Sequence, residues 1–298
     1  MPLTTETARA ETAPPAIGLF ALNGGETVRD PGDMRRTARL AEDLGYDSLW
    51  MGEHPVMPVP PPPGGWFHPG YVLNDPLITL SHLAALTGTI RLCTGVMLLP
   101  LRNPVIAAKQ VATLDRLSGG RMTLGFGMGY IRAQADAVGV PFAGRADRGR
   151  EHLEAMRALW YDEPPVSYRG AHVAFEGVES FPRPVQADLP VVAGGHTDKA
   201  LRLAVTHAHG WFAFGLPPAH LGALIERLRV VAAGVERPAR LEPLEITVSP
   251  PRGGVDKDLV DGYRRLGVDR LVLWPPPELG ADGLADFVRH NAAFVPAP

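Results

Sequence analysis

The chain has 298 residues, with 29 lysines and arginines, 32 aspartates and glutamates, and 45% hydrophobic residues. This composition is that of a globular protein with enough chain for a large core, folded either as about two domains or as one barrel of roughly 250 residues. A formal net charge of −3 without a long basic run argues against nucleic acid or an anionic membrane surface as the main partner.

Neither the start of the chain nor its cysteine content indicates export. No apolar stretch approaches the roughly 18 residues needed to cross a bilayer, and residues 1–16 lack the basic start and apolar core of a signal peptide. Cys93, the single cysteine, can form neither an internal disulfide nor a thiolate metal site, and we expect it to be a small buried residue. We therefore expect a cytoplasmic protein with a flexible leader over residues 1–15.

The first strand–helix unit has the pattern that the rest of the chain repeats. An apolar run over 17–21 predicts a strand, and the helical spacing of Leu40 and Leu44 predicts a helix over 34–44. Gly45 then ends that helix in the way of a C′ glycine.

The same unit recurs along the chain. The second helix has a clear start, because Asp75 is a good N-cap and Pro76 suits the first helical position. The remaining strands are expected at 46–50, 90–97, 122–126, 191–193, 211–214, 244–248 and 270–274. Their helices are expected at 76–85, 104–117, 145–161, 199–206, 219–233, 257–266 and 284–294.

The stretch 162–190 interrupts the alternation. It is proline-rich and holds two short β-like pieces, 166–168 and 172–175, so we expect an insertion between the fourth helix and the fifth strand. About eight strand–helix units fit a closed (β/α)8 barrel, or TIM barrel, better than an open sheet. The first strand–helix turn, 23–25, also lacks the G-x-G-x-x-G of an open dinucleotide-binding sheet. We predict an α/β protein with a single barrel domain over 16–298.

In such a barrel the chemistry lies in the loops that follow the strands. The second strand is followed by Glu53 and His54 and then by a long proline-rich loop, 55–71, which predicts a stiff lid. His54 is either a proton or hydrogen-bond donor near neutral pH or an imidazole fixed by a backbone carbonyl. Glu53 is either a hydrogen-bond acceptor at the strand end or a general base.

Glycines follow or interrupt the next three strands. Gly95, inside the third strand, predicts a bulge or the close approach of a flat group, with barrel packing as the alternative. Segment 125–130 is glycine-rich but lacks the residues of a P-loop, and segment 193–197 predicts either a phosphate site or a helix-capping turn. The ten histidines show no metal-ligand spacing, so we predict no metal site.

Several segments carry a family pattern in their order and spacing. They are LGYDSLWMGEH (44–54), AAKQVATLDRLSGGR (107–121), LGFGMGY (124–130), GVPF (139–142) with Arg145 and Glu151, and VAGGH (192–196). Together they resemble the bacterial luciferase-like flavin-dependent oxidoreductases over nearly the whole chain. Among these, the chain is most similar to the short subgroup that uses the deazaflavin coenzyme F420.

The resemblance implies where a cofactor would lie. The ring would cover the end of the third strand, against a bulge with a non-prolyl cis peptide, which by position is Gly95–Val96. The cofactor phosphate would be held by the loop 194–196, in agreement with the predicted anion site, and His54 would stand near the reactive edge of the ring. Tyr130 stands where F420-dependent sugar dehydrogenases carry a glutamate, which argues against that activity. Gln134 stands where many short members of the family carry an acidic residue.

The candidate site residues form three groups. The catalytic candidates are His54 and Tyr130. The candidates for cofactor binding are Glu53, Thr94, Gly95, Val96, Asn103, Gly127, Gly129, Gly194, Gly195 and His196. An apolar substrate lining, for which packing is the alternative, is expected from Trp66, Phe67, Met97, Met128 and Trp211.

Three functions are compatible with these residues and the resemblance. In the first, reduced F420 gives a hydride to, or takes it from, a small hydrophobic organic substrate, with His54 stabilising or protonating the developing anion and Tyr130 assisting. The second is an FMNH2- and O2-dependent monooxygenase, which hydroxylates or inserts oxygen, and the third is a non-catalytic partner subunit. The resemblance also implies a homodimer, with a flavin or F420 reductase as supplier of the reductant.

Overall fold

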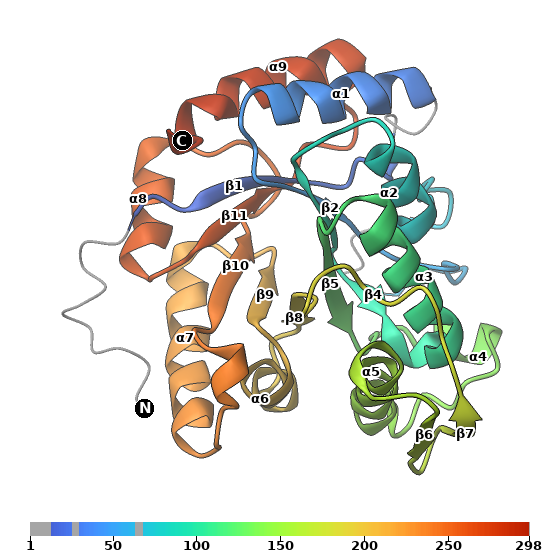
Figure 1. The fold of residues 1–298 in the computed structure, drawn as a ribbon. Coiled ribbons are helices and arrows are strands. Elements are labelled where there is room, and N and C mark those ends of the chain that lie inside the picture. The colour runs from blue at the N-terminus through green and yellow to red at the C-terminus, as the bar shows by residue number, and fades with distance from the viewer. Residues whose placement is uncertain (1–12, 26–29, 63–67, 298) are drawn as a thin grey trace.

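The predicted barrel is present in the computed structural model, which describes residues 13–25, 30–62 and 68–297 (Figure 1). Most of the predicted leader therefore lies outside the described residues. The strands of the barrel are β1 (Ala16–Phe20), β2 (Ser48–Met51), β3 (Arg91–Thr94), β4 (Met97–Leu98), β5 (Met122–Gly127), β8 (Val191–Gly194), β9 (Gly210–Phe214), β10 (Glu245–Ser249) and β11 (Arg270–Leu273).

These strands form one closed parallel sheet. Their order is β3-β2-β1-β11-β10-β9-β8-β5-β4, and a further pairing of β3 with β5 closes the ring. β3 and β4 are the two parts of the predicted third strand, so the barrel has eight strand positions. The (β/α)8 fold is thus confirmed.

A helix follows each strand position and packs outside the barrel. The helices are α1 (Pro31–Asp43), α2 (Pro76–Ala84), α3 (Pro104–Leu117), α5 (Arg145–Tyr161), α6 (Asp198–His207), α7 (Pro218–Ala233), α8 (Lys257–Arg265) and α9 (Ala281–Asn291). α9 lies beside α1, where the last unit meets the first, and α3 lies between α2 and α5 (Figure 1). Within the described ranges, no helix is long and apolar enough to cross a membrane.

Polar residues fix where helices begin. Asp75 accepts hydrogen bonds from two backbone N–H groups in the first turn of α2, which confirms the predicted N-cap. Asp30 caps α1 by accepting a hydrogen bond from the backbone N–H of Gly32, and that helix begins earlier than predicted. A short helix after β5, α4 (Arg132–Ala137), was not predicted, because six residues are too few to show a helical period.

The predicted insertion is an antiparallel hairpin of β6 (Val166–Arg169) and β7 (Ala174–Val178). Glu151 on α5 holds its turn, because its carboxylate accepts hydrogen bonds from the backbone N–H groups of residues 171–173. Burial opposes the ionisation of Glu151, but these three donors outweigh it and hold the pKa of the carboxyl below its usual value.

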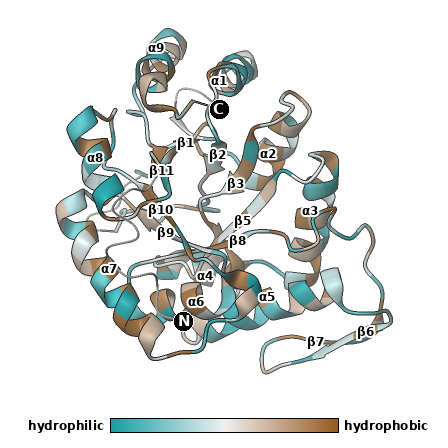
Figure 2. Ribbon diagram, turned by 60° about the vertical axis from the view of Figure 1, so that its left-hand side comes forward, coloured by the Kyte–Doolittle hydropathy of each residue, from teal (hydrophilic) through white to brown (hydrophobic). Residues whose placement is uncertain are grey.

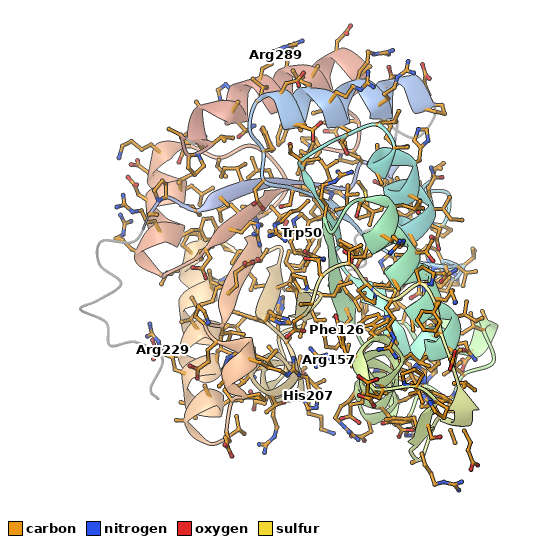
Figure 3. The ribbon with its side chains drawn as sticks, viewed as in Figure 1. Trp50, Phe126, Arg157, His207, Arg229 and Arg289 are labelled. Atoms are coloured by element: carbon orange, nitrogen blue, oxygen red, sulfur yellow. The ribbon has the colours of Figure 1, made fainter. Side chains whose placement is uncertain are left out.

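Apolar side chains fill the barrel and the shell around it. The interior holds Phe20, Ala21, Trp50, Cys93, Val192, Phe212, Val272 and Trp274. A larger cluster joins the outer faces of the strands to the helices, whose outward sides carry most of the hydrophilic residues (Figure 2). Figure 3 places Trp50 inside the barrel, whereas Arg229 and Arg289 project from the outer helices. Cys93 is buried, as predicted, and burial raises the pKa of its thiol to about 12.

Candidate functional site

The third strand is interrupted at the carboxyl end of the barrel. The Gly95–Val96 peptide between β3 and β4 is cis, as the resemblance implied. Just before it, the hydroxyl of Thr94 is fully buried and donates a hydrogen bond to the carbonyl oxygen of Gly125 at 2.6 Å. A Cβ atom on Gly125 would lie 1.9 Å from the carbonyl oxygen of Thr94, so only glycine permits this approach. Thr94 therefore joins β3 to β5 at the break.

The Val96 side chain lies between two of the predicted cofactor-binding glycines. A Cβ atom on Gly127 would lie 2.6 Å from one Val96 methyl group, and a Cβ atom on Gly194 would lie 2.9 Å from the other. The absence of side chains at Gly127 and Gly194 thus makes room for Val96 where β4, β5 and β8 end. Three predicted site residues are brought together here.

The loop between β8 and α6 is fixed by β9 behind it. The indole N–H of Trp211 donates to the carbonyl oxygen of Gly195 at 2.8 Å, and the backbone N–H of Phe214 donates to Nε2 of His196 at 3.2 Å. Burial lowers the pKa of His196, which favours the neutral ring that accepts this bond. Thr197 caps α6, so the predicted anion site and the predicted capping turn occupy the same loop.

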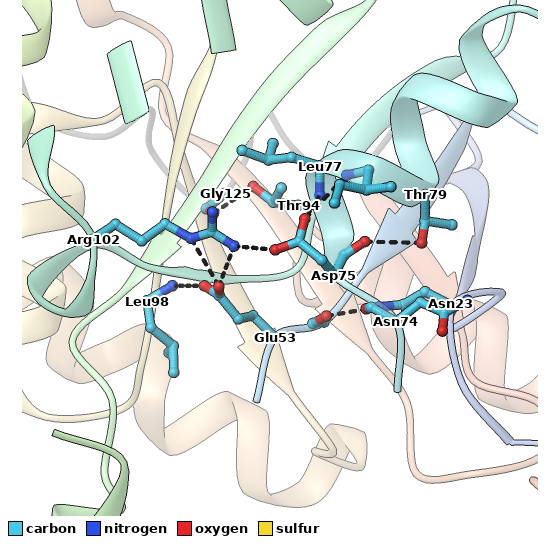
Figure 4. Close-up of polar contacts among 12 residues, drawn as sticks. Asn23, Glu53, Asn74, Asp75, Leu77, Thr79, Thr94, Leu98, Arg102 and Gly125 are labelled. Atoms are coloured by element: carbon cyan, nitrogen blue, oxygen red, sulfur yellow. Dashed lines mark hydrogen bonds and ion pairs between the residues drawn. The ribbon is translucent and has the colours of Figure 1, made fainter. Parts of the chain in front are cut away.

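Glu53 belongs to an ion-pair cluster that joins the end of β2 to β4 and α2 (Figure 4). Its Oε2 accepts a hydrogen bond from the backbone N–H of Leu98 at 2.6 Å, and its Oε1 accepts from Nε of Arg102 at 2.8 Å. Nη2 of Arg102 also lies 2.6 Å from Oδ2 of Asp75. These contacts favour the hydrogen-bond acceptor over the general base as the role of Glu53.

His54 borders a cavity of about 380 Å³, large enough for part of a small organic molecule. Its Nδ1 atom lies 2.9 Å from the amide nitrogen of Gln134, which is 1% exposed and lies on α4. Its ring is 6.1 Å from that of Tyr130, at an interplanar angle of 89°. Burial lowers the pKa of His54 and raises the pKa of Tyr130, so both rings are neutral near pH 7. The two catalytic candidates are therefore neighbours.

Two further residues at the site had no clear sequence signal. Gln134 was noted only as a departure from the family pattern, although it contacts His54 directly. Arg252, after β10, places its guanidinium carbon 3.8 Å from the ring centroid of Trp274 at the top of the barrel interior. An arginine in a loop after a barrel strand is the one signal that could have indicated it.

The remaining candidates have other surroundings. Met97 and Trp211 are fully buried in the shell between strands and helices, and Met128 packs against Gly149 of α5. These three side chains fit the packing alternative and not a shared substrate lining. Asn103 caps α3, with its side-chain oxygen engaged by two backbone N–H groups. Gly129 adopts a positive φ of 70° in the turn after β5.

Trp66 and Phe67, expected in the substrate lining, lie outside the described residues. In the part of the chain that the structure describes, no group of three or more His, Cys, Asp or Glu side chains could hold a metal ion.

Several known proteins are similar to this chain in sequence. The family model described as luciferase-like monooxygenase matches residues 14–251. An uncharacterised protein of Mycobacterium tuberculosis is 33% identical over 265 residues, which cover 86% of this chain and 91% of the relative. The 4-hydroxyprotoasukamycin monooxygenase of Streptomyces nodosus subsp. asukaensis is 30% identical over 288 residues, 89% of this chain and 74% of that protein.

A solved structure has the same fold at low sequence identity. It is an F420-dependent secondary alcohol dehydrogenase in complex with an F420-acetone adduct. The TM-score is 0.78 at 17% identity, and the match covers 96% of this chain and 100% of that one. At this identity the likeness concerns the fold alone.

Proposed function

This chain belongs to the luciferase-like monooxygenase family, and from that premise we propose that it uses reduced F420 for hydride transfer to or from a small hydrophobic organic substrate. The observation that carries the proposal is the position of His54 at the end of β2, beside the cavity and held by Gln134. A neutral imidazole there can donate a hydrogen bond to an oxygen that becomes negative when a hydride adds to the adjacent carbon.

The described residues fit a flat ring with a phosphate-bearing tail. At the break between β3 and β4, a Cβ atom on Gly95 would lie 3.0 Å from the Phe20 ring and 3.1 Å from the Trp50 ring, so the missing side chain makes room for these two aromatic residues. A flat ring would pack against this aromatic floor at the carboxyl end of the barrel. The tail phosphate fits the loop 194–196, because this loop leads into the ten-residue helix α6, whose N-terminus favours an anion.

When bound, reduced F420 supplies the hydride, and the chain supplies position and electrostatics. His54 would hold the substrate oxygen by a hydrogen bond and stabilise the charge that develops on it. Tyr130, protonated near pH 7 and 57% exposed, would stand between this oxygen and solvent. The aromatic interior around Trp50 and Phe212, whose rings stack at 5.1 Å, would keep water away from the opposite side.

A second candidate function is FMN- and O2-dependent oxygenation of the substrate. It is supported by the 30% identical relative, which is named as a monooxygenase. The same strand break and the same helix N-terminus would serve FMN, so the two functions differ in the cofactor and in the fate of the substrate. A non-catalytic partner subunit is the third. For either enzyme we propose a homodimer supplied by a flavin or F420 reductase.

An anaerobic turnover experiment tests the proposal. Reduced F420 is mixed with the protein and a panel of hydrophobic ketones and enones, and the appearance of oxidised F420 is followed. We expect protein-dependent oxidation of F420 with at least one member of the panel and a large loss of that rate in His54→Gln. Oxygen consumption with reduced FMN, together with an oxygenated product and no F420 oxidation, would favour the second function.

A further inference from the structure

The amide of Gln134 can be oriented in only one way without burying unpaired donors. Its Nε2 atom lies 2.7 Å from the carbonyl oxygen of Val56 and 2.9 Å from Nδ1 of His54. A carbonyl oxygen only accepts hydrogen bonds, so the atom that faces Val56 must be the amide nitrogen. The reversed amide would set two oxygens 2.7 Å apart and leave both amide N–H groups without these acceptors in a side chain that is 1% exposed.

This orientation determines which nitrogen of His54 carries the proton. The two N–H groups of the Gln134 amide match two acceptors, the Val56 carbonyl oxygen and Nδ1 of His54. Nδ1 must therefore present its lone pair, and the proton of the neutral ring lies on Nε2. Burial lowers the pKa of His54 and favours this neutral form. A Gln134 oxygen in contact with Nδ1 would raise the pKa of His54. That orientation is excluded, because it would place the Gln134 oxygen against the Val56 carbonyl oxygen.

The described charged groups that line the cavity beside His54 are paired with one another. Glu53 precedes it in the chain, and Asp75 and Arg102 line the same cavity. These three side chains pair with one another, so the carboxylates are turned to the guanidinium. Tyr130 meets the His54 ring edge to face and is protonated near pH 7.

We propose that Gln134 is a positioning residue that keeps His54 neutral with its proton on Nε2, so that His54 acts as a hydrogen-bond donor and does not carry a proton through the reaction. The use of this donor in hydride transfer rests on the proposed function, whereas the tautomer itself does not. Neutral imidazoles with lowered pKa values serve as electrophiles in this way.

The electron and proton balance follows from the tautomer. In the reductive direction a hydride brings two electrons to the substrate carbon, the C=O π bond breaks, and its electron pair moves to the oxygen. Loss of the Nε2 proton would leave His54 as an imidazolate, so the ring stabilises the oxyanion and keeps its proton. The proton that completes the alcohol comes from water, which reaches this side of the site at the half-exposed Tyr130.

Histidine NMR tests the tautomer directly. The protein is labelled with ¹⁵N-histidine, and the His54 ring is assigned as the signal set that is lost in His54→Gln. We expect Nδ1 to give the shift of an unprotonated nitrogen and Nε2 that of a protonated one near pH 7, and the ring to titrate only below its ordinary pKa. A proton on Nδ1, or titration near the ordinary value of about 6.5, would overturn the proposal. The measurement needs no cofactor or substrate, so its outcome is independent of the proposed function.

His152 is an internal control for this spectrum. Its Nδ1 lies 3.0 Å from the carbonyl oxygen of Leu99, which can only accept, so His152 must carry its proton on Nδ1. The two rings should therefore give opposite patterns in one sample. If both carried the proton on the same nitrogen, the assignment of the His54 tautomer from hydrogen-bond geometry would fail.

Gln134→Glu tests whether Gln134 sets the tautomer. A carboxylate accepts and does not donate, so Nδ1 of His54 should become protonated and the pKa of His54 should rise above its usual value. Once a substrate is known, the rate should gain a pH dependence near neutrality and fall roughly tenfold or more at pH 7. An unchanged tautomer in this variant would contradict the proposal, and the wild-type spectrum decides the matter if the variant does not fold.

Discussion

Arg102 is expected to stabilise the barrel mainly by balancing the buried charge of Glu53. The side chains of Glu53 and Arg102 are 8% and 18% exposed, whereas that of Asp75 is 36% exposed. Removal of one partner of a buried ion pair costs about 3–5 kcal/mol, because the other charge stays buried without compensation. Since Arg102 keeps some contact with water, we expect Arg102→Met to lower the free energy of unfolding by about 3 kcal/mol, the lower end of that range.

Asp75→Asn is the matched control. Asparagine is as good an N-cap as aspartate, so this change removes only the more exposed charge and should cost at most about 1 kcal/mol. Urea unfolding followed by tryptophan fluorescence compares the two variants, and Arg102→Met should cost much less when Glu53→Gln is already present. A loss of unfolding free energy below about 1 kcal/mol for Arg102→Met alone would refute the reasoning, because solvent-exposed ion pairs contribute that much.

Further variants test the strand break, the catalytic candidate and the hairpin. Gly125→Ala should cost about 3 kcal/mol or more in urea unfolding, because its Cβ would meet the Thr94 carbonyl oxygen at 1.9 Å, whereas Gly88→Ala, with nothing within 4 Å, should be nearly neutral. His54→Gln should lower kcat by roughly 100-fold in anaerobic stopped flow and leave the cofactor Kd nearly unchanged. An equal loss of kcat and of cofactor affinity would show that His54 does not act in the chemical step. Glu151 has a lowered pKa, so its contribution to stability is complete above its unfolded pKa of about 4.3 and is lost as the pH falls through the folded value. The cost of Glu151→Gln should therefore be larger at pH 6 than at pH 3, and an equal cost at both would contradict this role.

Local signals in the sequence were sufficient for the scaffold. Alternating apolar runs and helical patterns gave the barrel, and Asp75 marked a helix start because a cap acts on the residues that follow it. Gly95 likewise indicated the interruption of the third strand, because a side chain at this position would meet the rings of Phe20 and Trp50. The insertion was recognised because its prolines break the alternation.

Contacts between distant segments could not be read in this way. Gln134 meets His54 across 80 positions of the chain, on a helix too short to show a period. Trp211 was expected at the substrate, but it faces the helices while its neighbour Phe212 faces the barrel interior. Strands of a parallel barrel are buried on both faces, so hydrophobicity does not indicate which residue points inward. That choice depends on the register with neighbouring strands.

The most direct test of the central claim is a comparison of cofactor affinities. The purified protein is titrated separately with oxidised F420 and with FMN, and the fluorescence of its five tryptophans is followed. We predict quenching by F420 at micromolar concentration and much weaker binding of FMN. Tighter binding of FMN would contradict the F420 assignment and favour oxygenation, and binding of neither cofactor would favour a non-catalytic partner subunit.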